Sequence, residues 1–317
     1  MSDRPARTDL PVEDVIDDLR TALSRSASAV LVAPPGAGKT TLVPLRLLDE
    51  PWARGRRIVM LEPRRLAARA AARRMASMLG EEPGATVGYQ TRDERRIGAS
   101  TRVEVLTEGI LTRRLQNDPS LEGTALVIFD EVHERNVPTD LGLAFLLDAR
   151  RTLGSAVKVL AMSATPQVST FVSVLGRNAP ADVPVVSSDG RMHPVDVRFV
   201  PRSRDERLES SVTAAVTAAM RDDDGDVLVF LPGVGEINRC AESLRAVLPP
   251  GVRVHRLAGA LPFDEQDAAL APSEPGTRRV VLSTDIAESS LTVDGVRIVV
   301  DAGLARVPRL DARTGLT

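Results

Sequence analysis

A glycine-rich segment at residues 33–40 carries the residue types that hold a phosphate group. It reads APPGAGKT and matches the pattern G-x-x-x-x-G-K-[ST], except that Ala33 stands where the first glycine is usual. Backbone N–H groups in such a loop point at phosphate oxygens, Lys39 reaches the β- and γ-phosphates, and Thr40 binds Mg²⁺. An ordinary Gly/Pro turn is the alternative, but an apolar strand precedes this segment and a helix pattern follows it. The predicted nucleotide-binding residues here are Gly36, Ala37, Gly38, Lys39, Thr40 and Thr41.

Two adjacent carboxylates follow an apolar run about 90 residues downstream, in LVIFDEVHER. Alone, such a pair is usually a solvated strand end. After a phosphate loop, it supplies the second half of a nucleoside triphosphate site. Asp130 would hold Mg²⁺, and Glu131 would polarise the attacking water and lie at the metal. We therefore predict catalytic roles for Lys39, Asp130 and Glu131, and a Mg²⁺ site formed by Thr40, Asp130 and Glu131.

These motifs need a scaffold that brings distant strand ends together. Apolar strand patterns alternate with helix patterns from residue 29 onward, for example RRIVMLEP before LAARAAARRMASMLG, which predicts an α/β fold with parallel sheets. Ligands of such sheets bind at the carboxyl ends of the strands, where both motifs lie. The pattern breaks at residues 178–194, where we place a linker, and then resumes. The predicted division is a helical lead-in at 1–28, a first domain at 29–180 and a second at 192–317.

Composition excludes several other classes of protein. The chain has 317 residues, a net charge of −2 and a pI of about 6.0, so it is not a strongly basic histone-like binder. Its one cysteine, Cys240, excludes an internal disulfide framework and is expected to be a buried apolar residue. No apolar run approaches the ~20 residues of a membrane-spanning helix, and the N-terminus has no apolar signal core. We expect a cytoplasmic protein with no membrane association.

Further blocks lie in order along the chain, between and after the two motifs: LEPRRLAA at 61–68, LTEG at 106–109, SAT at 163–165, LVFLPG at 228–233 and STDIAESSLTVDG at 283–295. With DEVH at 130–133, they resemble the DEAH-type superfamily 2 helicases over nearly the whole chain. The resemblance implies two tandem RecA-like domains, ATP and Mg²⁺ as cofactors, and a single strand of RNA or DNA bound across both domains, RNA being favoured. It also implies a monomer.

The resemblance assigns roles to residues outside the phosphate loop. Arg74 would stack on adenine, although a solvated arginine is an equal alternative. His133 would link the nucleotide site to the strand-moving parts, with Ser163 and Thr165 coupling hydrolysis to domain movement. Thr284 and Asp294 would approach the nucleotide from the second domain. The strand-binding candidates, which would contact mainly phosphate and sugar, are Arg64, Arg65, Arg92, Thr107, Glu108 and Gly109, with Tyr89 in the same turn as Arg92.

The sequence departs from the family at Thr317, where it stops. Family members continue after the matching segment with a Q-R-x-G-R-x-G-R block whose arginines reach the γ-phosphate, and this sequence has none. We therefore expect a second domain that is incomplete, with an exposed sheet edge, either as part of a longer helicase or as a short protein. The leading hypothesis is an ATP-dependent helicase or translocase core, with slow turnover and no duplex unwinding. The alternatives are an ATP-gated RNA clamp with impaired hydrolysis and, less favoured, a P-loop kinase or metabolic ATPase.

Overall fold

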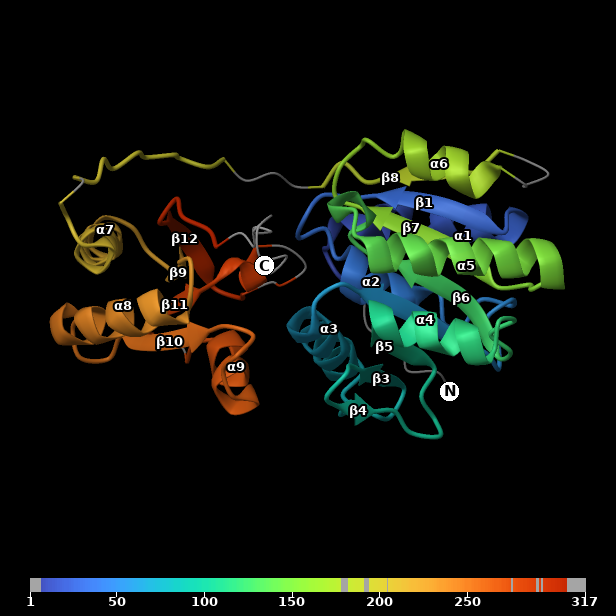
Figure 1. The fold of residues 1–317 in the computed structure, drawn as a ribbon, viewed down its shortest axis with the longest axis horizontal. Coiled ribbons are helices and arrows are strands. Elements are labelled where there is room, and N and C mark those ends of the chain that lie inside the picture. The colour runs from blue at the N-terminus through green and yellow to red at the C-terminus, as the bar shows by residue number, and fades with distance from the viewer. Residues whose placement is uncertain are drawn as a thin grey trace, which may run out of the picture. The chain divides into compact units, whose positions relative to one another are not determined.

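The computed structural model describes residues 7–177, 182–190, 194–203, 205–274, 276–288, 291 and 293–306. It separates into two compact units, Met1–His193 and Pro194–Thr317 (Figure 1). Part of the predicted linker, at 178–181 and 191–193, lies outside the described residues. The same is true of residues 289, 290 and 292 in the STDIAESSLTVDG block and of 307–317.

The first unit is built on one eight-stranded sheet. Its strand order is β4-β3-β5-β2-β6-β7-β1-β8, and every pairing is parallel except that of β3 with β4. The strands are β1 (Ser28–Val32), β2 (Arg57–Glu62), β3 (Val87–Gln90), β4 (Arg95–Arg96), β5 (Val103–Thr107), β6 (Thr124–Phe129), β7 (Lys158–Ser163) and β8 (Val185–Ser187). The predicted parallel α/β architecture is confirmed.

Helices cover both faces of this sheet, because its central strands are apolar on both sides. On β2, Ile58 and Met60 join one core while Val59 and Leu61 join the other. The first core packs against η1 (Pro11–Val15), α1 (Ile16–Arg25), α2 (Lys39–Arg46) and α3 (Arg65–Met78). The second packs against α4 (Glu108–Asn117), α5 (Val137–Leu153) and α6 (Ser169–Gly176), and Figure 1 shows α4 and α5 crossing that face. The short helix η2 (Val132–Glu134) follows β6.

The second unit contains a smaller parallel sheet with the order β10-β11-β9-β12. Its elements are α7 (Leu208–Asp222), β9 (Asp226–Phe230), α8 (Val234–Val247), β10 (Arg253–Leu257), α9 (Phe263–Leu270), β11 (Arg279–Ser283), η3 (Asp285–Ala287) and β12 (Val296–Asp301). Cys240 is fully buried in its core, as predicted. Strand β12 stands at one end of this order, and its Val299 is 58% exposed.

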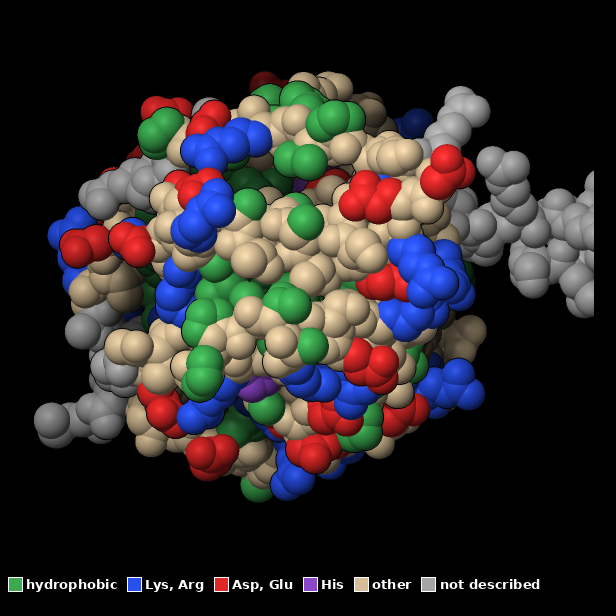
Figure 2. Space-filling model, turned by 90° about the vertical axis from the view of Figure 1, so that its left-hand side faces the viewer, with side chains coloured by type: hydrophobic (Ala, Val, Ile, Leu, Met, Phe, Trp, Pro, Cys, Tyr) green, Lys and Arg blue, Asp and Glu red, His purple; other side chains and the backbone are tan. Residues whose placement is uncertain are grey.

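A buried ion pair lies at the amino-terminal edge of the second sheet. Arg279 and Asp226 are almost fully buried, and the guanidinium Nε lies 2.9 Å from the Asp226 carboxylate. That carboxylate also accepts hydrogen bonds from the Arg279 N–H and the Ser273 hydroxyl. On the outer surface that Figure 2 presents, acidic and basic side chains are interspersed rather than gathered by sign, which agrees with a net charge near zero.

Candidate nucleotide and nucleic-acid site

The phosphate loop leaves the carboxyl end of β1 and enters α2 directly. The Ala33 N–H donates to the Ser163 carbonyl over 3.0 Å, which ties the start of the loop to β7. Gly36 and Gly38 then take positive φ values of 78° and 91°, which favour glycine. A Cβ on Gly38 would also lie 2.8 Å from Leu10 Cδ1. Helix α2 begins at the next residue, so its amino end faces the loop.

Two contacts join the loop to the carboxylate pair at the end of β6. The Lys39 Nζ lies 2.8 Å from Glu131 Oε1, and both side chains are only 5% exposed. The Thr40 hydroxyl donates to Asp130 Oδ2 over 2.6 Å. Residues 90 positions apart in the chain thus form one charged cluster at the carboxyl edge of the sheet.

The turn after β6 holds Glu131 in an unusual backbone conformation. Its φ is +51°, and its N–H donates to Asp130 Oδ1 over 2.8 Å. Such strain in a residue other than glycine often marks a functional position. Burial and the charge of Asp130 raise the pKa of Glu131, and Lys39 opposes them. A carboxylate whose pKa is raised is a better acceptor for a proton from water.

His133 bridges this carboxylate to the end of β7. Its Nδ1 lies 3.2 Å from Glu131 Oε2 and accepts the Ala164 N–H over 3.3 Å. The neighbouring turn is closed by Ser163, whose hydroxyl donates to the Thr165 carbonyl and accepts the Thr165 N–H. The structure therefore places His133, Ser163 and Thr165 next to one another and to Glu131.

One acidic residue of this cluster was missed by the sequence prediction. Glu62, the last residue of β2, is fully buried, and no donor N–H or O–H of the described residues bonds its carboxyl oxygens. Burial, followed by the negative charge of Asp130, raises the pKa of Glu62 well above its usual value. The signal in the sequence that could have identified Glu62 is a carboxylate at the end of an otherwise apolar strand pattern.

The strand-binding candidates gather beside the same sheet edge. Glu62 is in register with Thr107, so the segments that follow β2 and β5 emerge side by side. The Glu108 carboxylate accepts the Thr139 hydroxyl over 2.7 Å, and burial raises its pKa. Gly109 is exposed, with open space where a Cβ would be.

Part of the positive charge of these candidates is already compensated. Arg64 lies 3.6 Å from Glu134, and Arg65 forms an ion pair with Asp93. Arg74 and Arg92 are both exposed. The expectation that Tyr89 contacts the nucleic acid is wrong. Its side chain is 1% exposed and belongs to the first core, so it offers no surface to a nucleic-acid strand.

Two predicted residues, Thr284 and Asp294, belong to the second unit. Thr284 stands directly before η3, and its N–H donates to the Leu257 carbonyl at the end of β10. Asp294 is exposed, and its backbone carbonyl accepts a hydrogen bond from Arg279. Both are fixed by the second unit's own sheet.

Comparison with known proteins now bears on this site. The model of the DEAD/DEAH box helicase family matches residues 15–173, and the helicase conserved C-terminal domain matches residues 209–312. The chain belongs to the DEAD/DEAH box helicase family. The resemblance seen in the sequence is thereby confirmed, and the two units are tandem RecA-like domains.

Several members of the family are similar along nearly the whole chain. The ATP-dependent RNA helicase HrpB of Escherichia coli K12 is 47% identical over 97% of this chain, and the HrpA homolog of Haemophilus influenzae is 33% identical over 96%. A crystal structure of the E. coli DEAH/RHA helicase HrpB, 46% identical, superimposes with a TM-score of 0.88 over 97% of this chain and 39% of that one. The chain covers only 37% and 23% of the two relatives' lengths.

The helicase site fits a Mg²⁺–nucleotide complex. Mg²⁺ prefers oxygen ligands and is usually held by one or two carboxylates together with substrate phosphates. Thr40 and Asp130 supply a hydroxyl and a carboxylate that already touch, beside the loop that would hold the phosphates. Among the described residues, no group of three or more His, Cys, Asp or Glu could hold a metal alone, and no helix could span a membrane.

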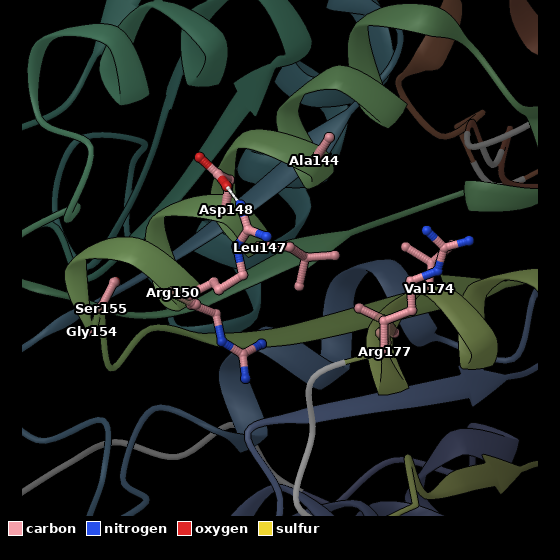
Figure 3. A pocket seen from close by; sticks show the side chains of 10 residues that line it. Ala144, Leu147, Asp148, Arg150, Gly154, Ser155, Val174 and Arg177 are labelled. Carbon is pink, nitrogen blue, oxygen red and sulfur yellow. Dashed lines mark hydrogen bonds and ion pairs between the residues drawn. The ribbon is translucent and has the colours of Figure 1, made fainter.

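A cavity of about 450 Å³ on the helicase's first domain lies apart from this site (Figure 3). Residues of α5 and α6 and of the segments directly after them line it from opposite sides, and three of these residues are arginines. Arg150 donates to the Ser28 hydroxyl, and Arg151 pairs with Asp148 over 2.8 Å. None of the predicted site residues lines this cavity.

Proposed function

We propose that this chain is the ATP-hydrolysing core of an RNA helicase and couples hydrolysis to movement along a single strand. The observation that carries the proposal is the pair of contacts Lys39–Glu131 and Thr40–Asp130. The first contact places Lys39, which would bind the phosphates, beside Glu131, which would activate water. The second places the two metal-binding groups, Thr40 and Asp130, beside each other.

The residues of the first domain would divide the work of hydrolysis. The amides of the phosphate loop and Lys39 bind the phosphates, and Thr40 and Asp130 hold the metal. Mg²⁺, when bound, neutralises the charge on the β- and γ-phosphates. Glu131 orients the attacking water and accepts its proton. His133 carries the change at Glu131 to the Ser163–Thr165 turn.

The nucleic acid would run over the carboxyl ends of β2 and β5. Arg64, Arg65, Arg92 and the segment Thr107–Gly109 would contact its phosphates and sugars, which suits movement without sequence preference. Arg74 would stack on adenine, and Thr284 and Asp294 would approach the nucleotide from the second domain. The names of the relatives favour RNA over DNA. We further propose a monomer acting in the cytoplasm.

The decisive experiment is the rate of ATP hydrolysis by the purified chain, alone, with single-stranded RNA and with single-stranded DNA. Glu131→Gln serves as the blank, and Glu134→Gln removes the same charge from a neighbouring residue. RNA should raise the wild-type rate more than DNA does, and only Glu131→Gln should abolish it. A wild-type rate equal to the blank, with ATP still bound, would instead indicate an RNA clamp.

A further inference from the structure

Glu62 is a buried carboxyl group with no role in the proposed hydrolysis. It is fully buried, and no donor of the described residues pairs with either oxygen. The other fully buried glutamate of this sheet, Glu104, is compensated by Arg57 and Arg114. Buried polar groups without partners are rare and costly, so Glu62 requires a reason other than stability.

The strand register places Glu62 beside Asp130. Strands β2 and β6 pair in parallel with Leu61 opposite Phe129, and the Asp130 N–H donates to the Leu61 carbonyl over 3.2 Å. The next residues along, Glu62 and Asp130, are therefore lateral neighbours. Two residues earlier, Met60 and Ile128 point into the same core, so by alternation Glu62 and Asp130 share that face.

That face is the one that α2 covers, where Thr40 reaches Asp130. The Asp130 carboxylate therefore has Thr40 and the Glu131 N–H at its outer end and Glu62 beside it in the sheet. Lys39 does not compensate Glu62 by an ion pair, since its ammonium is held by Glu131.

We propose that Glu62 is a positioning residue, whose carboxyl head packs beside the Asp130 side chain and limits it to the orientation that binds Mg²⁺. The inference rests on the proposed nucleotide site and adds a residue that supports a metal ligand rather than touching the metal. Such supporting partners commonly change metal affinity by about 10- to 100-fold when removed. The contact needs a planar head group of the right length, which glutamine also supplies and leucine does not.

The test compares Glu62→Gln, Glu62→Leu and the matched control Glu104→Gln in the full chain. The first readout is the Mg²⁺ concentration that half-saturates binding of fluorescently labelled ADP. The second is the thermal unfolding midpoint without nucleotide or metal. Glu62→Leu should raise the half-saturating Mg²⁺ concentration by about 10- to 100-fold, while its unfolding midpoint stays level or rises. Glu62→Gln should stay close to wild type in Mg²⁺ dependence.

The control should behave in the opposite way, because Glu104→Gln leaves two arginines uncompensated far along β5 from the metal. It should lower the unfolding midpoint and leave the Mg²⁺ dependence unchanged. Wild-type Mg²⁺ dependence in Glu62→Leu, or an equal loss in Glu62→Gln, would overturn the positioning role while the nucleotide site stands. Failure of the wild-type chain to bind ADP would overturn both proposals.

Discussion

The ion pair between Lys39 and Glu131 predicts how one substitution changes nucleotide affinity. Without nucleotide, Glu131 holds the Lys39 ammonium at 2.8 Å in a site where both side chains are 5% exposed. The phosphates need the same ammonium, so binding must break or weaken this contact. Glu131→Gln replaces a charge-assisted hydrogen bond by a weaker one and should therefore bind nucleotide more tightly, while abolishing hydrolysis.

The size of the effect follows from the strength of such contacts. A hydrogen bond that involves a charged group contributes about 1.5–3 kcal/mol, and the bond from the ammonium to an uncharged amide oxygen should lie near the lower end of that range, with the ion pair near the upper end. The free energy needed to release Lys39 from residue 131 should fall by about 0.8–1.5 kcal/mol. At ~1.4 kcal/mol per factor of ten, nucleotide binding should become roughly 4- to 12-fold tighter. Loss of repulsion between the Glu131 carboxylate and the phosphates acts in the same direction.

The assay is titration of labelled ADP in EDTA, which separates competition for Lys39 from any change at the metal. Glu134→Gln is the control, because it removes one negative charge nearby without touching Lys39. It should leave the affinity unchanged. An affinity of Glu131→Gln equal to or weaker than that of the wild type would refute the reasoning that the ion pair opposes binding.

Three further outcomes follow from single sites. Gly38→Ala should weaken nucleotide binding and lower stability by about 1–3 kcal/mol in thermal unfolding, since it combines a positive φ with a clash at Leu10. Asp226→Ala should destabilise the second domain by about 3–5 kcal/mol in urea unfolding, because Arg279 would stay buried without its partner. Burial, then neighbouring arginines, lower the pKa of His255 below its usual 6.5, so the unfolded chain binds more protons just below that pH. Stability should therefore fall as pH drops below about 6.5, and His255→Asn should reduce that fall in melting curves.

The fold and the centre of the site were predictable because each motif lies at a junction that the sequence pattern marks. The phosphate loop follows one apolar strand and DEVH follows another, and parallel strands end at a common edge. Neighbouring ends of β1, β6 and β7 then bring Lys39, Thr40, Asp130 and Glu131 together. Predicting the centre of the site required only the residue types and their position after a strand.

Contacts that depend on strand order or on tertiary packing were not predictable from the pattern. Leu10 packs against Gly38, although the segment before the first strand carries no motif. Tyr89 belongs to an apparent surface turn, yet it ends in the core because β3 lies between β4 and β5. Burial of an aromatic ring there depends on α3, which covers that face.

The neighbours of Glu62 also depend on the strand order, which the sequence pattern does not give. In chain order, β2 stands far from both Thr107 and Asp130, but in the sheet it lies between β5 and β6. Glu62 is in register with Thr107 on one side and adjacent to Asp130 on the other. One strand therefore separates the proposed RNA-contacting segment from the proposed metal ligand. A shift of the β5 end on RNA binding would reach Asp130 across the two rows of backbone hydrogen bonds that join β5 to β2 and β2 to β6, with Glu62 as the side chain between them.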